Sequence, residues 1–172
     1  AAGARRAKDA AAARHWLAQH DPTNRFEAVT APGDDGRMAL ERVPWFFEPA
    51  LLPVLHRLDC CQRDNNVAGA VGEIGVYHGR GFAPLALLRR EGEAAVAVDC
   101  FDEQQHNRDG SGVGSEAALG AVLARFGCAE NVRVLRCDST RLTAGDLLAA
   151  AGQPLRIMSV DGSHTEDAVL AD

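Results

Sequence analysis

The sequence predicts an α/β protein in which a doubly wound parallel sheet follows an N-terminal helical region. Three observations support this fold class. From residue 67 onward, strand-like and helix-like segments alternate; the strand-like segments are continuous apolar runs; and a glycine-rich turn follows the first of them. Continuous apolar strands are typical of parallel sheets that helices cover on both faces. Right-handed crossovers then wind such a sheet in both directions.

Residues 1–66 are expected to form a helical cap region. The alanine-rich residues 1–20 predict a helix, because alanine is the best helix former. After an Asp-Pro-Thr break, residues 25–30 could form a short strand, and the run APGDDG at 31–36 indicates a loop. Residues 45–62 carry an interrupted helical pattern, with a proline near the start of its second part, where proline is tolerated.

Residues 67–172 are expected to form the domain that holds the sheet. The predicted strands span Val67–Tyr77, Ala94–Phe101, Val132–Cys137 and Leu155–Val160. The predicted helices span Phe82–Arg90, Ser115–Phe126, Leu142–Ala151 and a segment from Thr165 onward. Because the sequence stops at Asp172, inside a predicted helix and with the fourth strand near an edge, we expect another segment to complete the sheet.

Composition argues against several classes of partner. The chain has 172 residues, of which 47% are hydrophobic, enough for a substantial core. Its net charge is −6 with dispersed acids, and only 5% of residues are aromatic. Binding to a phosphate backbone needs a basic stripe, and binding to single strands needs aromatic platforms. We therefore predict that the protein does not bind nucleic acid.

The cysteines and the hydropathy indicate the cellular compartment and whether the chain crosses a membrane. None of the five cysteines belongs to a C-x-x-C pair, so a zinc site has no support. Reduced and mostly buried thiols are the expected state, which favours a cytoplasmic protein. No apolar run approaches the ~18 residues that a membrane span needs. We therefore predict no membrane partner.

The glycine-rich turn is the most informative stretch of the chain. It reads EIGVYHGRG from Glu73 to Gly81, an acid followed by glycines at 75, 79 and 81, and differs from the G-x-G-x-x-G of dinucleotide binders. A carboxylate at the strand end would repel a pyrophosphate but attract the α-ammonium group of S-adenosylmethionine. The pattern therefore favours S-adenosylmethionine over NAD, although a glycine turn without any ligand is the alternative.

Polar residues follow each of the other predicted strands. Asp99 comes after the second strand, Asp138 and Ser139 after the third, and Asp161 to His164 after the fourth. Ligands of open α/β sheets bind outside the carboxyl ends of the strands, where an acid at the position of Asp99 can hold the ribose hydroxyls of a nucleoside. Each residue also has a simpler interpretation as a turn former or helix cap. Taken together, the polar strand ends predict one ligand groove.

Residues ~67–172 resemble a class I S-adenosylmethionine-dependent methyltransferase. The closer resemblance is to the branch of small-molecule O-methyltransferases that modify natural products and sugars. The resemblance rests on EIGVYHGRG, AVDCFDEQQHNRDGSGVG, CDS and SVDGSHTEDAVLAD. It implies a Rossmann-like sheet of seven strands in the order 3-2-1-4-5-7-6, of which this chain supplies the first four.

The resemblance also implies roles for individual residues. Glu73 and Gly75 would line the methionine part of the cofactor, Asp99 would hold the ribose, and Asp138 and Ser139 would approach the adenine. Further cofactor contacts are expected from Tyr77, Gly79, Cys100 and Phe101. The loop 101–114 would fold over the cofactor as a lid, with Gln104, Gln105, Asn107 and Ser111 as its polar residues, unless it is simply a mobile surface loop.

Methyl transfer to a hydroxyl group suggests two catalytic residues. A hydroxyl must lose its proton, and a histidine is a suitable base at neutral pH. We predict that His164 takes this proton and that Asp161 binds Mg²⁺, although magnesium wants several oxygen ligands. Tyr77 and His78 are predicted to contact the acceptor. Trp45-Phe46 is a further substrate-side candidate, for which core packing is the alternative.

Two other functions remain open at this level. One is an NAD(P)-dependent oxidoreductase on a similar sheet, and the other is a non-catalytic cofactor-binding domain used for assembly. The sequence does not name the small-molecule acceptor, and a homo-oligomer is possible.

Overall fold

Four parallel strands form the sheet, in the order β3-β2-β1-β4. They span Ala70–Ile74 (β1), Ala95–Asp99 (β2), Val132–Arg136 (β3) and Leu155–Val160 (β4). The computed structural model describes residues 2–35, 37–44, 47–107 and 109–172, without the side chains of residues 2–7 and 104. Trp45 and Phe46 lie outside these described residues. The predicted α/β class and the first four places of the implied strand order are confirmed.

The register of the sheet brings the strand ends together. Ile74 of β1 pairs with Val98 of β2 and with Val160 of β4, and Asp99 pairs with Arg136 of β3. Residues that follow these positions therefore meet at one edge of the sheet. The fourth strand matches its predicted bounds. The first begins at Ala70, not Val67, and ends at Ile74, because Gly75 has φ +83° and turns the chain out of the sheet.

Helices precede the sheet and alternate with its strands. The α-helices span Ala2–His20 (α1), Glu27–Thr30 (α2), Leu51–Asp64 (α3), Phe82–Leu87 (α4), Glu116–Arg125 (α5), Ala144–Ala151 (α6) and Glu166–Ala171 (α7). Short 3₁₀ turns span Ala39–Arg42 (η1), Gln104–His106 (η2) and Ser139–Arg141 (η3).

Side-chain hydrogen bonds cap the N-termini of two of these helices. The Ser115 hydroxyl accepts a hydrogen bond from Ala118 N and caps α5. Thr143 and Asp146 form a capping box on α6.

The predicted strand at residues 25–30 is wrong. Residues 27–30 form the helical turn α2, whose Val29 is buried. The hydroxyl of Thr30 donates to the Phe26 carbonyl oxygen at 2.8 Å, a local bond that suits a helical turn. Residues 25–30 contain only three apolar side chains, Phe26, Ala28 and Val29, which are too few to distinguish a helical from a strand period.

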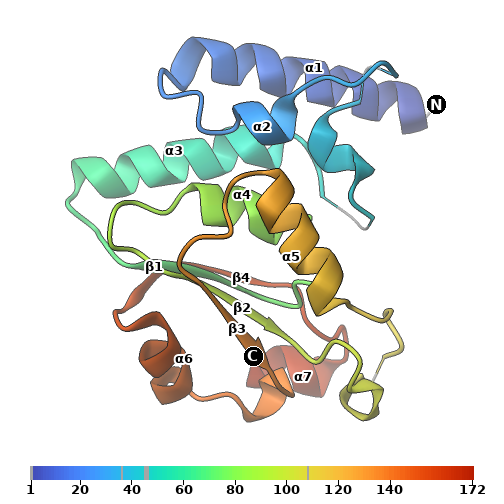
Figure 1. Ribbon diagram of the computed structural model, residues 1–172, viewed down its shortest axis with the longest axis vertical. Helices are drawn as coiled ribbons and strands as arrows, with labels where there is room; N and C mark the ends of the chain where they lie inside the picture. The colour runs from blue at the N-terminus through green and yellow to red at the C-terminus, as the bar shows by residue number, and fades with distance from the viewer. Residues whose placement is uncertain (1, 36, 45–46, 108) are drawn as a thin grey trace.

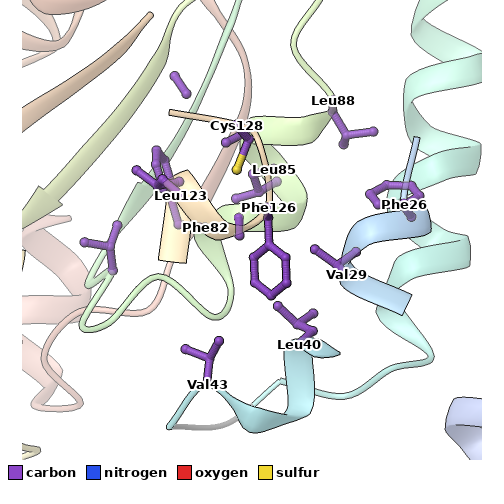
Figure 2. Packing of buried hydrophobic residues seen from close by; sticks show 14 of the residues in the cluster. Phe26, Val29, Leu40, Val43, Phe82, Leu85, Leu88, Leu123, Phe126 and Cys128 are labelled. Atoms are coloured by element: carbon purple, nitrogen blue, oxygen red, sulfur yellow. The ribbon is translucent and has the colours of Figure 1, made fainter. Parts of the chain in front are cut away.

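The layers are visible in Figure 1. Helices α6 and α7 lie on one face of the sheet, and α4 and α5 lie on the other, with α3 and then α1 stacked beyond them. The larger core fills the second side. In Figure 2, Val29 and Leu40 from the N-terminal region approach the ring of Phe126 near α4 and α5. Residues on both sides of the predicted boundary at 66 thus share one hydrophobic core.

A buried ionic network joins the helical region to the sheet at the edge opposite the strand ends. The Arg156 side chain, fully buried at the start of β4, contacts Asp59 of α3 and Glu93 before β2, each at 3.0 Å. Burial alone would raise the pKa of Asp59, but hydrogen bonds from Arg63, Arg25 and Arg90 bring that pKa below its ordinary value. Asp59 is therefore ionised and held by cations from several elements.

Two further predictions concern cysteines and membranes. All five cysteines are free thiols. Only Cys128 is buried, while Cys61 is exposed and the others are intermediate, so the expectation of mostly buried thiols is wrong. Within the described part of the chain, no helix has the length and apolar character needed to cross a bilayer.

Candidate functional site

A polar pocket lies at the carboxyl ends of the strands, where open α/β sheets bind ligands. Eight of the predicted site residues line it: Gly75, Tyr77, Asp99, Cys100, Asp138, Ser139, Asp161 and His164. The loop after β2 contributes the opposite wall through His106, Asn107, Ser111, Gly112 and Gly114. The structure thus brings together the ends of all four strands and the loop predicted to act as a lid.

Asp99 organises two loops of this pocket. Its Oδ2 accepts a hydrogen bond from Tyr77 N at 2.7 Å, and its Oδ1 accepts one from Phe101 N at 2.6 Å. Tyr77 and Phe101 both have positive φ, 51° and 48°, a conformation that non-glycine residues rarely adopt. The carboxylate therefore compensates the cost of two tight turns, and each oxygen retains a second lone pair for a ligand.

Glycines let the walls approach closely. A Cβ on Gly75 would lie 1.9 Å from the carbonyl oxygen of Asp161, so only glycine lets the segment after β4 pass this turn. A Cβ on Gly114 would lie 3.0 Å from Oδ1 of Asp99. The two glycines leave backbone where side chains would otherwise fill the pocket.

Glu73 lies beside this pocket rather than in it. Its carboxylate occupies a second, mainly apolar pocket between α3, β1 and β4, which shares Gly75 and Asp161 with the first. A Cβ on Gly81 would lie 2.6 Å from Oε1 of Glu73, so the third glycine of the motif makes room for the acid. Burial raises the pKa of Glu73 from its ordinary 4.5 to about 8, opposed by a hydrogen bond from Ser159 and aided by Asp161 and Asp99.

The raised pKa predicts a pH-dependent stability. Between about pH 4.5 and pH 8 the unfolded chain ionises Glu73 while the folded protein keeps it protonated, so stability falls as pH rises through this window. In wild type, the free energy of unfolding should fall by an amount on the order of 3 kcal/mol across this window, and in Glu73→Gln this fall should be absent. Urea unfolding of both proteins across the window measures the difference. Glu130→Gln, at an exposed position, is the control and should follow the wild-type curve. Parallel curves for wild type and Glu73→Gln would contradict the raised pKa.

Asp138 has the capping role that sequence reasoning left open. Its Oδ1 accepts hydrogen bonds from Thr140 N at 3.1 Å and from the Thr140 hydroxyl at 2.7 Å. Its Oδ2 lies 3.6 Å from Nδ1 of His106. Asp138 can therefore cap η3 with Oδ1 and line the pocket with Oδ2.

Three other predicted residues lie outside the polar pocket wall. Gly79 has φ +87°, and a Cβ there would lie 2.6 Å from the Leu119 side chain, so this glycine serves the contact with α5. The ring of His78 stacks on Tyr77 at 3.9 Å between centroids. Phe101 is 1% exposed and belongs to the hydrophobic core, which leaves its backbone as the part nearest the site.

His164 stands between two carboxylates. Its Nδ1 lies 3.1 Å from Oδ2 of Asp109, and the same oxygen accepts a hydrogen bond from His164 N at 2.7 Å. Its Nε2 lies 3.7 Å from Oδ1 of Asp161. Sequence reasoning missed Asp109 and His106. The Asp-Gly-Ser run around Asp109 signals a turn, but no local pattern pairs it with a histidine 55 positions away.

The charges of the pocket are one-sided. Its described lining carries three aspartates, Asp99, Asp138 and Asp161, with two histidines and neither lysine nor arginine. Such a site attracts cations and repels phosphate groups. Among the residues that the structure describes, no group of three or more His, Cys, Asp or Glu side chains is arranged to hold a metal ion. The donor set near Asp161 therefore does not make a magnesium site by itself.

Comparison with known protein families identifies the kind of domain. A family model described as a methyltransferase domain matches residues 73–172, which is more than half of the chain and runs from Glu73 through all of the strand ends described above. No curated protein matches the sequence significantly.

Proposed function

Because the chain belongs to the methyltransferase domain family, we propose that it uses S-adenosylmethionine to methylate a hydroxyl group of a small molecule. Methyl transfer is the activity of the family, whereas the cofactor, the hydroxyl and the small molecule are parts of the proposal. The single observation that supports S-adenosylmethionine as the cofactor is the lining of the pocket. Its described residues include three aspartates and no basic side chain other than histidine.

This donor set fits a cationic ligand. S-adenosylmethionine carries a sulfonium and an α-ammonium group, and both gain from nearby carboxylates in a partly desolvated site. The pyrophosphate of NAD(P) would meet the same carboxylates as a repulsion. Glu73 also favours a cationic ligand, but only once the ligand is bound. Since its pKa is raised to about 8, it is mostly neutral at pH 7 without a ligand and becomes an anion when a cation arrives nearby.

The remaining contacts follow the order of the strand ends. In this proposal Asp99 accepts hydrogen bonds from the ribose hydroxyls, Asp138 and Ser139 approach the adenine, and Gly75 lies against the methionine part; all four residues line the pocket. The space open in the pocket is about 80 Å³, below the roughly 300–1,000 Å³ of sites that enclose small ligands. Residues 101–107 and 109–114 therefore have to move outward for the cofactor to enter, which supports their role as a lid.

The main chemical task of the protein is to remove the proton of the acceptor hydroxyl. The bound cofactor supplies an activated methyl group on sulfur, so the protein mainly positions the two reactants. His164 takes the proton of the acceptor hydroxyl through Nε2, the ring nitrogen that faces Asp161 across the pocket wall. The stacked rings of Tyr77 and His78 offer a surface for the acceptor, for which a natural product or sugar is the proposed class.

Magnesium binding by Asp161 stays a prediction. Magnesium keeps near-octahedral oxygen coordination and is usually held by one or two carboxylates together with waters and substrate oxygens. Among the described residues, Asp161 is not part of any group of three or more His, Cys, Asp or Glu side chains that could hold a metal ion. Turnover measured with and without a chelator tests whether a metal ion takes part in the reaction.

Ligand binding tests the proposed cofactor directly. We expect S-adenosylhomocysteine to raise the melting temperature and to give a saturable heat in calorimetry, whereas NAD and NADP should do neither. Stabilisation by NAD or NADP alone would support the oxidoreductase alternative and overturn this proposal. Binding of S-adenosylhomocysteine without methylation of any hydroxyl compound in a broad acceptor panel would favour the non-catalytic alternative.

Replacing His164 tests the base. We expect His164→Ala to lower kcat roughly 100-fold or more, because a positioned general base contributes about 10²–10⁴-fold, while the affinity for S-adenosylhomocysteine stays within about twofold. His15→Ala, at an exposed position on α1, is the matched control and should turn over like wild type. Unchanged kcat in His164→Ala would exclude the base role.

A further inference from the structure

The His164 ring has different neighbours at its two nitrogens. Nδ1 lies 3.1 Å from Oδ2 of Asp109, within hydrogen-bond length. Nε2 lies 3.7 Å from Oδ1 of Asp161, beyond that length. The Asp109 side chain is 15% exposed and that of Asp161 is 48% exposed. Asp109 is thus the closer and less hydrated carboxylate, and it faces the nitrogen turned away from the proposed reaction.

Asp109 is itself held in a defined orientation. Its Oδ1 accepts a hydrogen bond from Ser111 N at 2.9 Å, which leaves Oδ2 for His164. The Asn107 side chain donates to the Gly112 carbonyl oxygen at 2.8 Å and closes the same turn. The backbone hydrogen bond from His164, followed by bonds from Ser111, lowers the pKa of Asp109, so the group is an anion at neutral pH.

We propose that Asp109 is a positioning residue that orients His164 by accepting a hydrogen bond from Nδ1–H, which leaves Nε2 unprotonated and able to act as the base. This inference rests on the proposed function, in which His164 takes the acceptor proton. The hydrogen bond at one ring nitrogen decides which tautomer is present. A carboxylate can only accept, so the neutral ring must carry its proton on Nδ1.

The assigned tautomer gives a balanced step. The acceptor hydroxyl gives its proton to Nε2 of His164, and its oxygen forms the new bond to the methyl carbon. The carbon–sulfur bond breaks and its electron pair stays on sulfur, which becomes a neutral thioether. The resulting imidazolium lies between Asp109 and Asp161, and both carboxylates stabilise its positive charge. The proton later leaves from Nε2 to solvent, so Asp109 is never protonated.

The contact also links the base to the lid. Asp109 belongs to the loop whose residues 111, 112 and 114 line the pocket, while His164 follows β4. The hydrogen bond to Nδ1 therefore exists only while this loop lies over the pocket. An outward loop that admits the cofactor would leave the His164 ring without its orienting partner.

The tautomer can be measured without any methyl transfer. We expect ¹⁵N NMR of the ligand-free protein at alkaline pH to show the His164 proton on Nδ1, and Asp109→Ala to move it largely to Nε2, the tautomer that free imidazole side chains prefer. Asp102→Ala, in the same loop at a side chain that is 70% exposed, should leave the His164 signals unchanged. A proton on Nε2 in the wild-type protein, or no change in Asp109→Ala, would overturn the proposal.

Kinetics then separate orientation from loop stability. We expect Asp109→Ala to lower kcat roughly 10- to 100-fold, a part of the base contribution, and to add almost nothing in a His164→Ala background. An equal loss in both backgrounds would show that Asp109 does not act through His164. The two proposals fail differently, since wild-type turnover by His164→Ala would remove the base role and leave the NMR result unaffected.

Discussion

Asp99→Ala is expected to lower the affinity for S-adenosylhomocysteine at least 100-fold. Hydrogen bonds to charged groups contribute about 1.5–3 kcal/mol each, and the proposed ribose contacts use the two oxygens of this carboxylate. The substitution also removes the acceptor of Tyr77 N and Phe101 N. Both turns then lose the interaction that holds them at positive φ, and the pocket floor they form becomes less ordered.

Calorimetry with S-adenosylhomocysteine and urea unfolding check this expectation together. The free energy of unfolding should fall by about 2–4 kcal/mol, since two backbone donors lose a charged partner. Asp64→Ala removes an equal charge at an exposed position at the end of α3 and should change neither quantity. A folded Asp99→Ala protein that binds S-adenosylhomocysteine as tightly as wild type would exclude the ribose role.

Arg156→Met is expected to give the largest loss of stability. The fully buried guanidinium donates to Gln62 Oε1 at 2.7 Å, to the Leu88 carbonyl oxygen at 2.8 Å and to the Glu93 carboxylate. Removing one partner of a buried ion pair costs about 3–5 kcal/mol, because the other charge remains buried without compensation. Methionine has a similar length, so the loss reports the charge and hydrogen bonds more than a cavity.

Urea unfolding measures the Arg156→Met effect. Arg133→Met is the matched control, because Arg133 is an exposed arginine of β3 whose side chain donates a long hydrogen bond, 3.4 Å, to the neighbouring Val132 carbonyl oxygen. It should change stability by no more than about 0.5 kcal/mol. The double variant Arg156→Met/Glu93→Gln should lose less than the sum of the single losses, because neutralising Glu93 removes the uncompensated charge. Additive losses would mean that the two side chains are not coupled.

Much of the fold could be predicted because its signals are local. Apolar runs marked the strands, and Ser115 marked the start of α5 because a hydroxyl before a helix caps its first turn. The strand-end residues Asp99, Asp138 and Asp161 could be placed in one groove because parallel strands end at the same edge. The predicted strand at residues 25–30 was wrong because a mixed segment of six residues is too short to show whether its apolar residues follow a helical or a strand period.

The candidate site was predicted less completely, for a different reason. Glu73 was identified as the acid of the glycine motif, but its direction depends on the alternation of side chains along β1, which points it toward Gly81 and Ser159. The burial that raises its pKa depends in turn on residues of β4, far along the chain, where Ile157 and Ser159 line the same pocket. Neither quantity is encoded in the motif itself.

By itself the sequence determined the alternation of strands and helices, the glycine turn and the identity of the side chains at each strand end, because period, propensity and turn chemistry act within a few residues. The tertiary structure alone decided that Glu73 lies outside the polar pocket and that Asp109 meets His164. These outcomes depend on which face of a strand is covered and on how a long loop folds back across the sheet, and both are set by packing between segments distant in the chain.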